Sequence, residues 1–183
     1  MSISKKKAGS DNNISGGCLP LYYHQHQEEL SISQKFALAR FTKKFCCLSS
    51  CSITVIPAFH SLTKGKLTLD LVDTRRQQED PLQSYITLMF PLCQQKTVTL
   101  SDFPTVSTKV IEPYRLKVKI EVTGIKFGQI VAYLKLTPAF VYTNSISLPK
   151  ELTINAYTSQ GTEYVTKKKI LDKGVDTTAL SFI

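Results

Sequence analysis

Four carboxylates lie close together in the middle of the chain, at Asp70, Asp73, Glu79 and Asp80. Such a group could hold the divalent ion of a nuclease, because hard cations take carboxylate oxygens as ligands. Asp70 and Asp73, however, are separated by an odd number of positions, so on a strand they point to opposite faces. They could not both bind one ion, and we expect no metal site here.

Other residues that could do chemistry lack the partners they would need. The sequence contains neither a Gly-rich phosphate-binding loop nor a GxSxG motif. The histidines, His24, His26 and His60, have no evident Ser or Cys partner. The sequence therefore predicts that the protein is not an enzyme and uses no cofactor.

The five cysteines, an odd number, are typical of a protein from a reducing compartment. Cys46, Cys47 and Cys51 crowd one segment and could bind zinc, but no second pair of ligands follows them. We interpret them as thiols that pack in the core like small hydrophobic side chains.

The chain carries 23 Lys and Arg residues against 14 Asp and Glu, a net charge of +9. This excess favours a polyanionic partner, either nucleic acid or an anionic membrane surface. No signal peptide opens the chain and no apolar stretch is long enough to span a bilayer, so membrane association is expected to be peripheral. The candidate nucleic-acid contacts are lysines in three clusters: Lys5, Lys6 and Lys7; Lys117 and Lys119; and Lys167, Lys168 and Lys169.

Asp73 ends the clearest strand of the sequence. Leu67, Leu69 and Leu71 alternate with polar residues, which is the period of a strand with one buried face. Asp73 is the next position on that face, and Arg75 follows on the same side. Because a buried carboxylate needs partners, we expect Asp73 to accept hydrogen bonds from loop amides or to pair with Arg75. The alternative is a strand end whose Asp caps a turn.

Short strand patterns recur along the chain with loops between them, which favours a mainly β fold. We predict a single antiparallel β-sandwich, jelly-roll-like, with one or two short helices. One helix is expected at 33–45, and a surface helix or tail at 166–174. The predicted domain organisation is a flexible basic N-terminal arm at 1–30, the sandwich at 31–160 and a basic C-terminal segment at 161–183.

The segment around Asp73 resembles the central signature of a protein family. It reads LVDTRR from Leu71, then Asp80, then SYIT from Ser84. From about residue 45 to 154 the order of motifs is similar to the movement proteins of the plant-virus thirty-kilodalton (30K) superfamily. The further motifs that agree are Val118–Val122, Ile125–Gly128 and Leu134–Tyr142.

This resemblance implies a viral cell-to-cell movement protein that binds single-stranded RNA or viral nucleoprotein without sequence specificity and carries it through plasmodesmata. It implies peripheral contact with host endomembrane, a location in the cytoplasm, at plasmodesmata and at the cell periphery, and it leaves a homo-oligomer open. Leu71, Asp73 and Arg75 are then signature residues with an architectural role.

Two alternatives stay open. A viral matrix protein that bridges nucleocapsid and membrane is also small and basic, with a lysine-bearing N-terminus. A host nucleic-acid-binding domain of OB type has the right size and charge, but it would need an interleaved aromatic stripe, which the sequence does not display.

Overall fold

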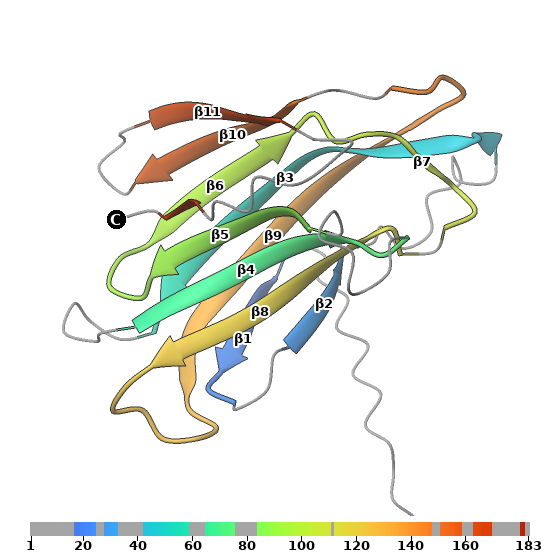
Figure 1. Ribbon diagram of the computed structural model, residues 1–183. Helices are drawn as coiled ribbons and strands as arrows, with labels where there is room; N and C mark the ends of the chain where they lie inside the picture. Colours follow the sequence, from blue (N-terminus) through green and yellow to red (C-terminus); the bar gives the residue numbers. More distant parts are fainter. Residues whose placement is uncertain are drawn as a thin grey trace, which may run out of the picture.

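The computed structural model describes residues 17–24, 28–32, 42–58, 65–75, 84–110, 112–147, 151–158, 163–169 and 180–181. Two β-sheets pack face to face (Figure 1). The large sheet has the strand order β1-β9-β3-β6-β10-β11, with β7 paired to β3, and the small sheet has the order β12-β5-β4-β8-β2. All pairings are antiparallel except that of β12 with β5.

The strand bounds, in chain order, are β1 (Cys18–Tyr22), β2 (Glu28–Ile32), β3 (Phe45–Pro57), β4 (Gly65–Asp73), β5 (Ser84–Pro91), β6 (Lys96–Ser101), β7 (Val106–Ser107), β8 (Tyr114–Val122), β9 (Ile130–Thr143), β10 (Glu151–Thr158), β11 (Glu163–Lys169) and β12 (Leu180–Ser181).

Alternating side chains build the core between the two sheets. Along β4, Leu67, Leu69 and Leu71 are fully buried, while Lys66 and Thr68 lie on the other face. The same period runs through β3, β6 and β8, so each strand buries one face against the opposite sheet. The antiparallel β-sandwich predicted from the sequence is confirmed.

The sandwich begins earlier in the chain than the predicted boundary at residue 31. Cys18–Tyr22 forms β1 beside β9, and Glu28–Ile32 forms β2 beside β8. Leu21 and Leu30 are buried because these pairings place them over the core. An alternation of apolar and polar residues over so short a segment is a weak signal for a strand. Pairing with β9 and β8 therefore decides the conformation of these two segments.

The structure describes part of each predicted helical segment. In the segment predicted at 33–45, Thr42 is helical. Phe45, the end of the helix predicted at 33–45, opens β3, while residues 33–41 lie outside the described part. Residues 166–169 belong to β11, which pairs with β10, while 170–174 lie outside it. At Phe45 and along 166–169, a neighbouring strand supplies hydrogen bonds that the local pattern does not reveal. The described ranges contain no helix that is long and apolar enough to cross a membrane.

Candidate nucleic-acid interface

Asp73 is a buried carboxylate with several hydrogen-bond donors around it. Its side chain is only 2% exposed. One of its oxygens accepts hydrogen bonds from the backbone N–H and the side-chain Nε of Arg75, at 3.0 and 2.8 Å. The other accepts from Arg75 Nη2 and from the Tyr85 hydroxyl, the latter at 2.9 Å. The prediction that Asp73 is withdrawn from water and pairs with Arg75 is confirmed.

These partners keep Asp73 charged. Burial alone would raise the pKa of Asp73, but the hydrogen bonds and charge of Arg75, with the Tyr85 hydroxyl, lower it below its usual value of 3.8. Burial and the neighbouring carboxylate raise the pKa of Tyr85, so its hydroxyl stays protonated and donates. The protonation states at this site are therefore fixed at neutral pH, which suits a structural ion pair better than a proton-transfer site.

An aromatic cluster beside Asp73 joins the two sheets. Phe103, in the loop after β6, packs against Tyr85 of β5 and Tyr114 of β8, with ring centroids 5.7 and 5.8 Å apart. The Tyr114 hydroxyl donates to the Pro104 carbonyl at 3.2 Å. Asp73 thus anchors the end of β4 beside a contact between sheets, which supports an architectural role for it.

The cysteines of β3 contribute to packing. Cys46 and Cys51 are buried, as interpreted from the sequence, and all five cysteines are free thiols. Burial raises the pKa of Cys51 to about 12. Cys47 is half-buried, and its thiol donates to the Phe103 carbonyl at 3.4 Å. Within the described residues, no three His, Cys, Asp or Glu side chains form a group that could hold a metal ion.

The outer face of the small sheet carries both signs of charge. Lys119 is exposed on β8, but Glu121 binds it at 2.8 Å and also binds Lys66 of β4 at 2.7 Å. Lys117 is in register with Asp70 on β4. The lysines predicted as a basic stripe therefore lie among carboxylates, which the sequence pattern of β8 alone does not reveal.

Arginine on the same strand is paired as well. Arg115 binds Glu29 of β2 at 3.3 Å and Glu112 at 3.2 Å. The positive charges of β8 are thus largely compensated, and this face is a poor surface for a polyanion.

The other predicted lysine clusters are not on β8. Lys167–Lys169 belong to β11, whose backbone pairs with Glu151–Thr153 at one edge of the large sheet. Lys5, Lys6 and Lys7 lie outside the described residues. The structure therefore does not gather the predicted basic residues that it describes into one surface.

The outer face of the large sheet carries hydroxyl groups and little charge. At its outward positions in β1, β3, β6, β9 and β10, Glu151 is the only carboxylate among the described residues. Glu151 and Asp102, which follows β6, lie at the end of the sheet opposite the β8–β9 hairpin. Two pairs of hydroxyl groups hydrogen-bond across β3 and β6, at 3.1 and 2.9 Å: Ser52 with Thr99, and Thr54 with Thr97.

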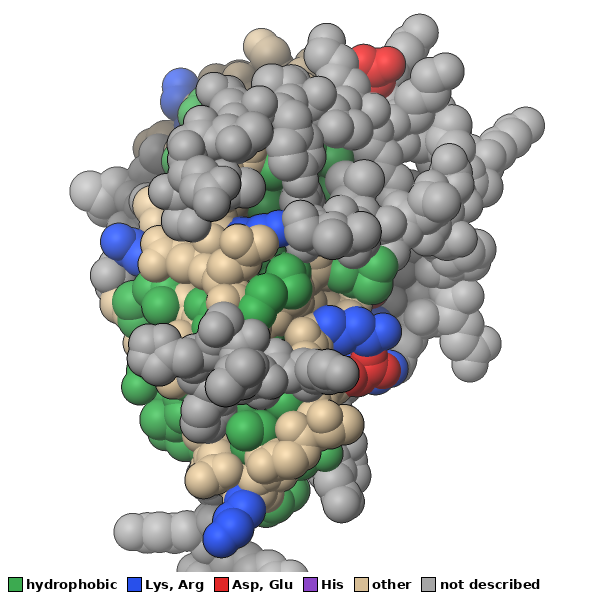
Figure 2. Space-filling model, turned by 90° about the vertical axis from the view of Figure 1, so that its left-hand side faces the viewer, with side chains coloured by type: hydrophobic (Ala, Val, Ile, Leu, Met, Phe, Trp, Pro, Cys, Tyr) green, Lys and Arg blue, Asp and Glu red, His purple; other side chains and the backbone are tan. Residues whose placement is uncertain are grey.

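Exposed aromatic and basic side chains meet where this face reaches the β8–β9 hairpin, which we call the hairpin end. Phe127 is 67% exposed, Tyr22 38% and Tyr133 37%. Lys126 is exposed next to Phe127 in the hairpin, and Lys135 is exposed on β9, two positions from Tyr133 and in register with Thr54. This end of the sandwich is turned to the viewer in Figure 2, where hydrophobic side chains lie among polar ones and the few Lys and Arg side chains are scattered, one of them next to a carboxylate.

Sequence reasoning missed this group because its members come from β1, the hairpin and β9. No single stretch shows an aromatic stripe. One local signal existed, since Tyr133 and Lys135 alternate on β9 with the buried Leu134 and Leu136.

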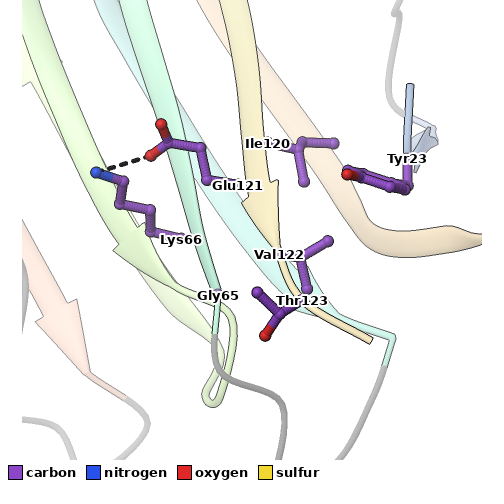
Figure 3. A pocket seen from close by; sticks show the side chains of 7 residues that line it. All are labelled: Tyr23, Gly65, Lys66, Ile120, Glu121, Val122 and Thr123. Atoms are coloured by element: carbon purple, nitrogen blue, oxygen red, sulfur yellow. Dashed lines mark ion pairs between the residues drawn. The ribbon is translucent and has the colours of Figure 1, made fainter. Parts of the chain in front are cut away.

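A hollow of about 680 Å³ adjoins the hairpin end. Ile120 and Val122 of β8 form its wall opposite Tyr23, while the Lys66–Glu121 ion pair lies on the other side of the strand (Figure 3). The hollow is therefore largely apolar toward Tyr23 and polar at its rim.

Comparisons with protein-family models, with curated proteins and with solved structures find no match for this chain. The resemblance to 30K movement proteins therefore remains a prediction.

Proposed function

We propose that this protein binds single-stranded RNA, or nucleoprotein that contains it, without reading its sequence. The observation that carries this proposal is the hairpin end, where the exposed rings of Phe127 and Tyr22 flank His24, and where Lys126 and Lys135 have no carboxylate partner among the described residues. Lysines neutralise phosphates and aromatic rings stack on any base, so neither contact requires a particular sequence. The net charge of +9 supports the same partner.

We further propose that the binding serves cell-to-cell movement of a plant virus, with peripheral contact to endomembrane or plasmodesmata. This part is supported by the resemblance of the Leu71–Arg75 segment and by the β-sandwich that carries it. The two-sheet sandwich differs from the five-stranded barrel of an OB-fold, so the host OB-type alternative is dropped. The experiments below distinguish the movement role from the viral matrix role.

Binding is tested by fluorescence anisotropy with two unrelated single-stranded RNAs of equal length, and with a duplex, at two salt concentrations. We expect similar affinity for both single strands, weaker binding to the duplex and a marked loss of affinity at the higher salt. Preference for one sequence, or no binding at low salt, would contradict the proposal.

The biological role is tested by complementation of a movement-defective virus in leaf tissue. We expect infection foci of many cells when the protein is supplied in trans. Foci that stay confined to single cells, together with incorporation of the protein into virions, would instead support the matrix role.

A further inference from the structure

We propose that Phe127 and Tyr22, which flank His24, together with Tyr133 on β9 form the surface on which bases of single-stranded RNA stack, and that Lys126 and Lys135 hold phosphates of the same strand. This inference deepens the proposed function and depends on it. It assigns the RNA to the hairpin end of the large sheet and not to the lysines of β8.

Phe127 is held in an exposed position by a tight turn. The Gln129 N–H donates to the Lys126 carbonyl at 3.1 Å, and the Lys126 N–H donates to Gln129 Oε1 at 3.0 Å. Gly128 follows Phe127 with φ of 81°, the value that the third position of a type II turn requires. Glycine adopts this conformation without strain, so the turn presents the Phe127 ring at its second position.

Backbone hydrogen bonds fasten this turn to the segment after β1. The Tyr23 N–H donates to the Gln129 carbonyl at 2.8 Å, and the Gly128 N–H donates to the Tyr23 carbonyl at 2.9 Å. The His24 ring then lies between two others, 5.4 Å from Phe127 and 5.9 Å from Tyr22. Three rings from two distant parts of the sequence are thus assembled before any ligand arrives, which lowers the entropy cost of stacking.

Packing within the domain does not account for this exposed ring. Phe127 has the largest exposed fraction of the exposed large hydrophobic residues, which also include Ile146 at 63% and Val141 at 51%. A single exposed apolar side chain is common, but exposed rings that gather in one place, as Phe127 and Tyr22 do around His24, are typical of a binding surface.

The hairpin end has two exposed lysines and one carboxylate, Glu28, which binds His24 at 3.3 Å, so its balance of charge favours a polyanion. Lys126 adjoins Phe127 in the turn, and Lys135 lies two positions from Tyr133 on β9. Neither lysine has a carboxylate partner among the described residues. A phosphate could therefore bind either lysine without displacing an existing ion pair.

RNA fits this surface better than a bilayer does. The exposed rings are separated by polar neighbours, and the face beyond them is lined by hydroxyl groups such as those of Thr54 and Thr97. Insertion into a membrane would need a continuous apolar area, whereas bases need separate rings with polar groups between them.

The test compares Phe127→Ala with the parent and with Val141→Ala, which removes an exposed apolar side chain from the opposite end of the same sheet. We expect Phe127→Ala to bind single-stranded RNA about ten-fold more weakly, with an unchanged dependence on salt because every lysine is retained. Val141→Ala should bind like the parent, and Phe127→Tyr should recover most of the affinity because it keeps a ring. Lys126→Ala should reduce the slope of log affinity against log salt by about one.

The outcomes separate the inference from the function on which it depends. If the parent does not bind RNA, the proposed function fails. If the parent binds and Phe127→Ala binds equally well, this inference alone is overturned. Sedimentation with anionic phospholipid vesicles is the second measurement: loss of vesicle binding in Phe127→Ala with RNA binding intact would assign the ring to a membrane and overturn the inference as well. Thermal melts should be alike for all variants, because Phe127 contributes little to the core.

Discussion

The two outer faces of the sandwich are built on the same strand geometry but differ in what they can bind. On the small sheet, lysine and arginine of β8 meet carboxylates on β2, on β4 and within β8, as in the Lys66–Glu121–Lys119 chain. On the large sheet, hydroxyl groups occupy the centre, where Lys135 is in register with Thr54, while aromatic rings and Lys126 lie at the hairpin end and Glu151 at the far end.

This difference shows that the number of lysines on a strand does not locate a polyanion site. The pairs on the small sheet are half-exposed, so each contributes at most about 1 kcal/mol to stability. They nevertheless cancel the electrostatic potential that would attract a phosphate backbone. The better candidate is the hairpin end of the large sheet, where Lys126 and Lys135 have no carboxylate partner among the described residues.

The largest effect on stability is expected at Asp73, which is buried between the two sheets. Asp73→Ala removes a carboxylate that accepts hydrogen bonds from Arg75 and Tyr85, and leaves the Tyr85 donor without its acceptor. Arg75 is partly exposed, so water can replace Asp73 as its hydrogen-bond partner, which limits the damage. We expect a loss of about 2–4 kcal/mol in the free energy of unfolding. Urea denaturation measures it.

Asp70→Ala is the matched control for that substitution. Asp70 lies on the opposite face of β4 and accepts hydrogen bonds from the hydroxyls of Ser84 and Thr87. We expect a loss of about 1 kcal/mol or less. If Asp70→Ala were the more damaging of the two, the assignment of inner and outer faces to β4 would have to be reversed.

The next effect is a pH dependence of the same site. The pKa of Asp73 is lower in the folded protein than in the unfolded chain, so its contribution is complete above the unfolded value of about 3.9 and is lost as pH falls through the folded value. The difference in unfolding free energy between the parent and Asp73→Asn should therefore shrink as pH falls below about 4. A difference that stays constant down to about pH 2 would argue against a charged Asp73 in the folded state.

Charge reversal on each face tests the comparison directly. Lys135→Glu places a carboxylate beside Tyr133 on the large sheet, and we expect affinity for single-stranded RNA to fall about five- to ten-fold. Lys119→Glu alters the already compensated face of the small sheet and should change affinity less than about two-fold. Anisotropy titrations at one salt concentration measure both, and the reverse order would assign RNA to the small sheet.

The smallest effect should come from releasing the lysines of the small sheet. Glu121→Gln breaks the ion pairs with Lys66 and Lys119, all of which are half-exposed, and should cost less than about 1 kcal/mol of stability. RNA affinity should rise slightly, because two ammonium groups become available to phosphates. A decrease in affinity would mean that the intact ion pairs themselves take part in binding.

Local alternation of apolar and polar residues in the sequence was enough to predict the fold class, the burial of Asp73 and its pairing with Arg75. The apolar period of β4 predicted that Asp73 faces inward, and the nearness of Arg75 predicted its partner, because both depend on residues only two positions apart. The same local reasoning correctly placed buried thiols at Cys46 and Cys51.

Only the tertiary structure decided where the charges cancel and where the rings gather. Glu29 reaches Arg115 and Lys66 reaches Glu121 because β2, β4 and β8 pair in one particular register, which no single strand specifies. Phe127 meets His24 because the end of β1 hydrogen-bonds to a hairpin about a hundred residues further along the chain. Contacts over such sequence separations depend on the packing of the whole sandwich, and so they cannot be predicted from local patterns.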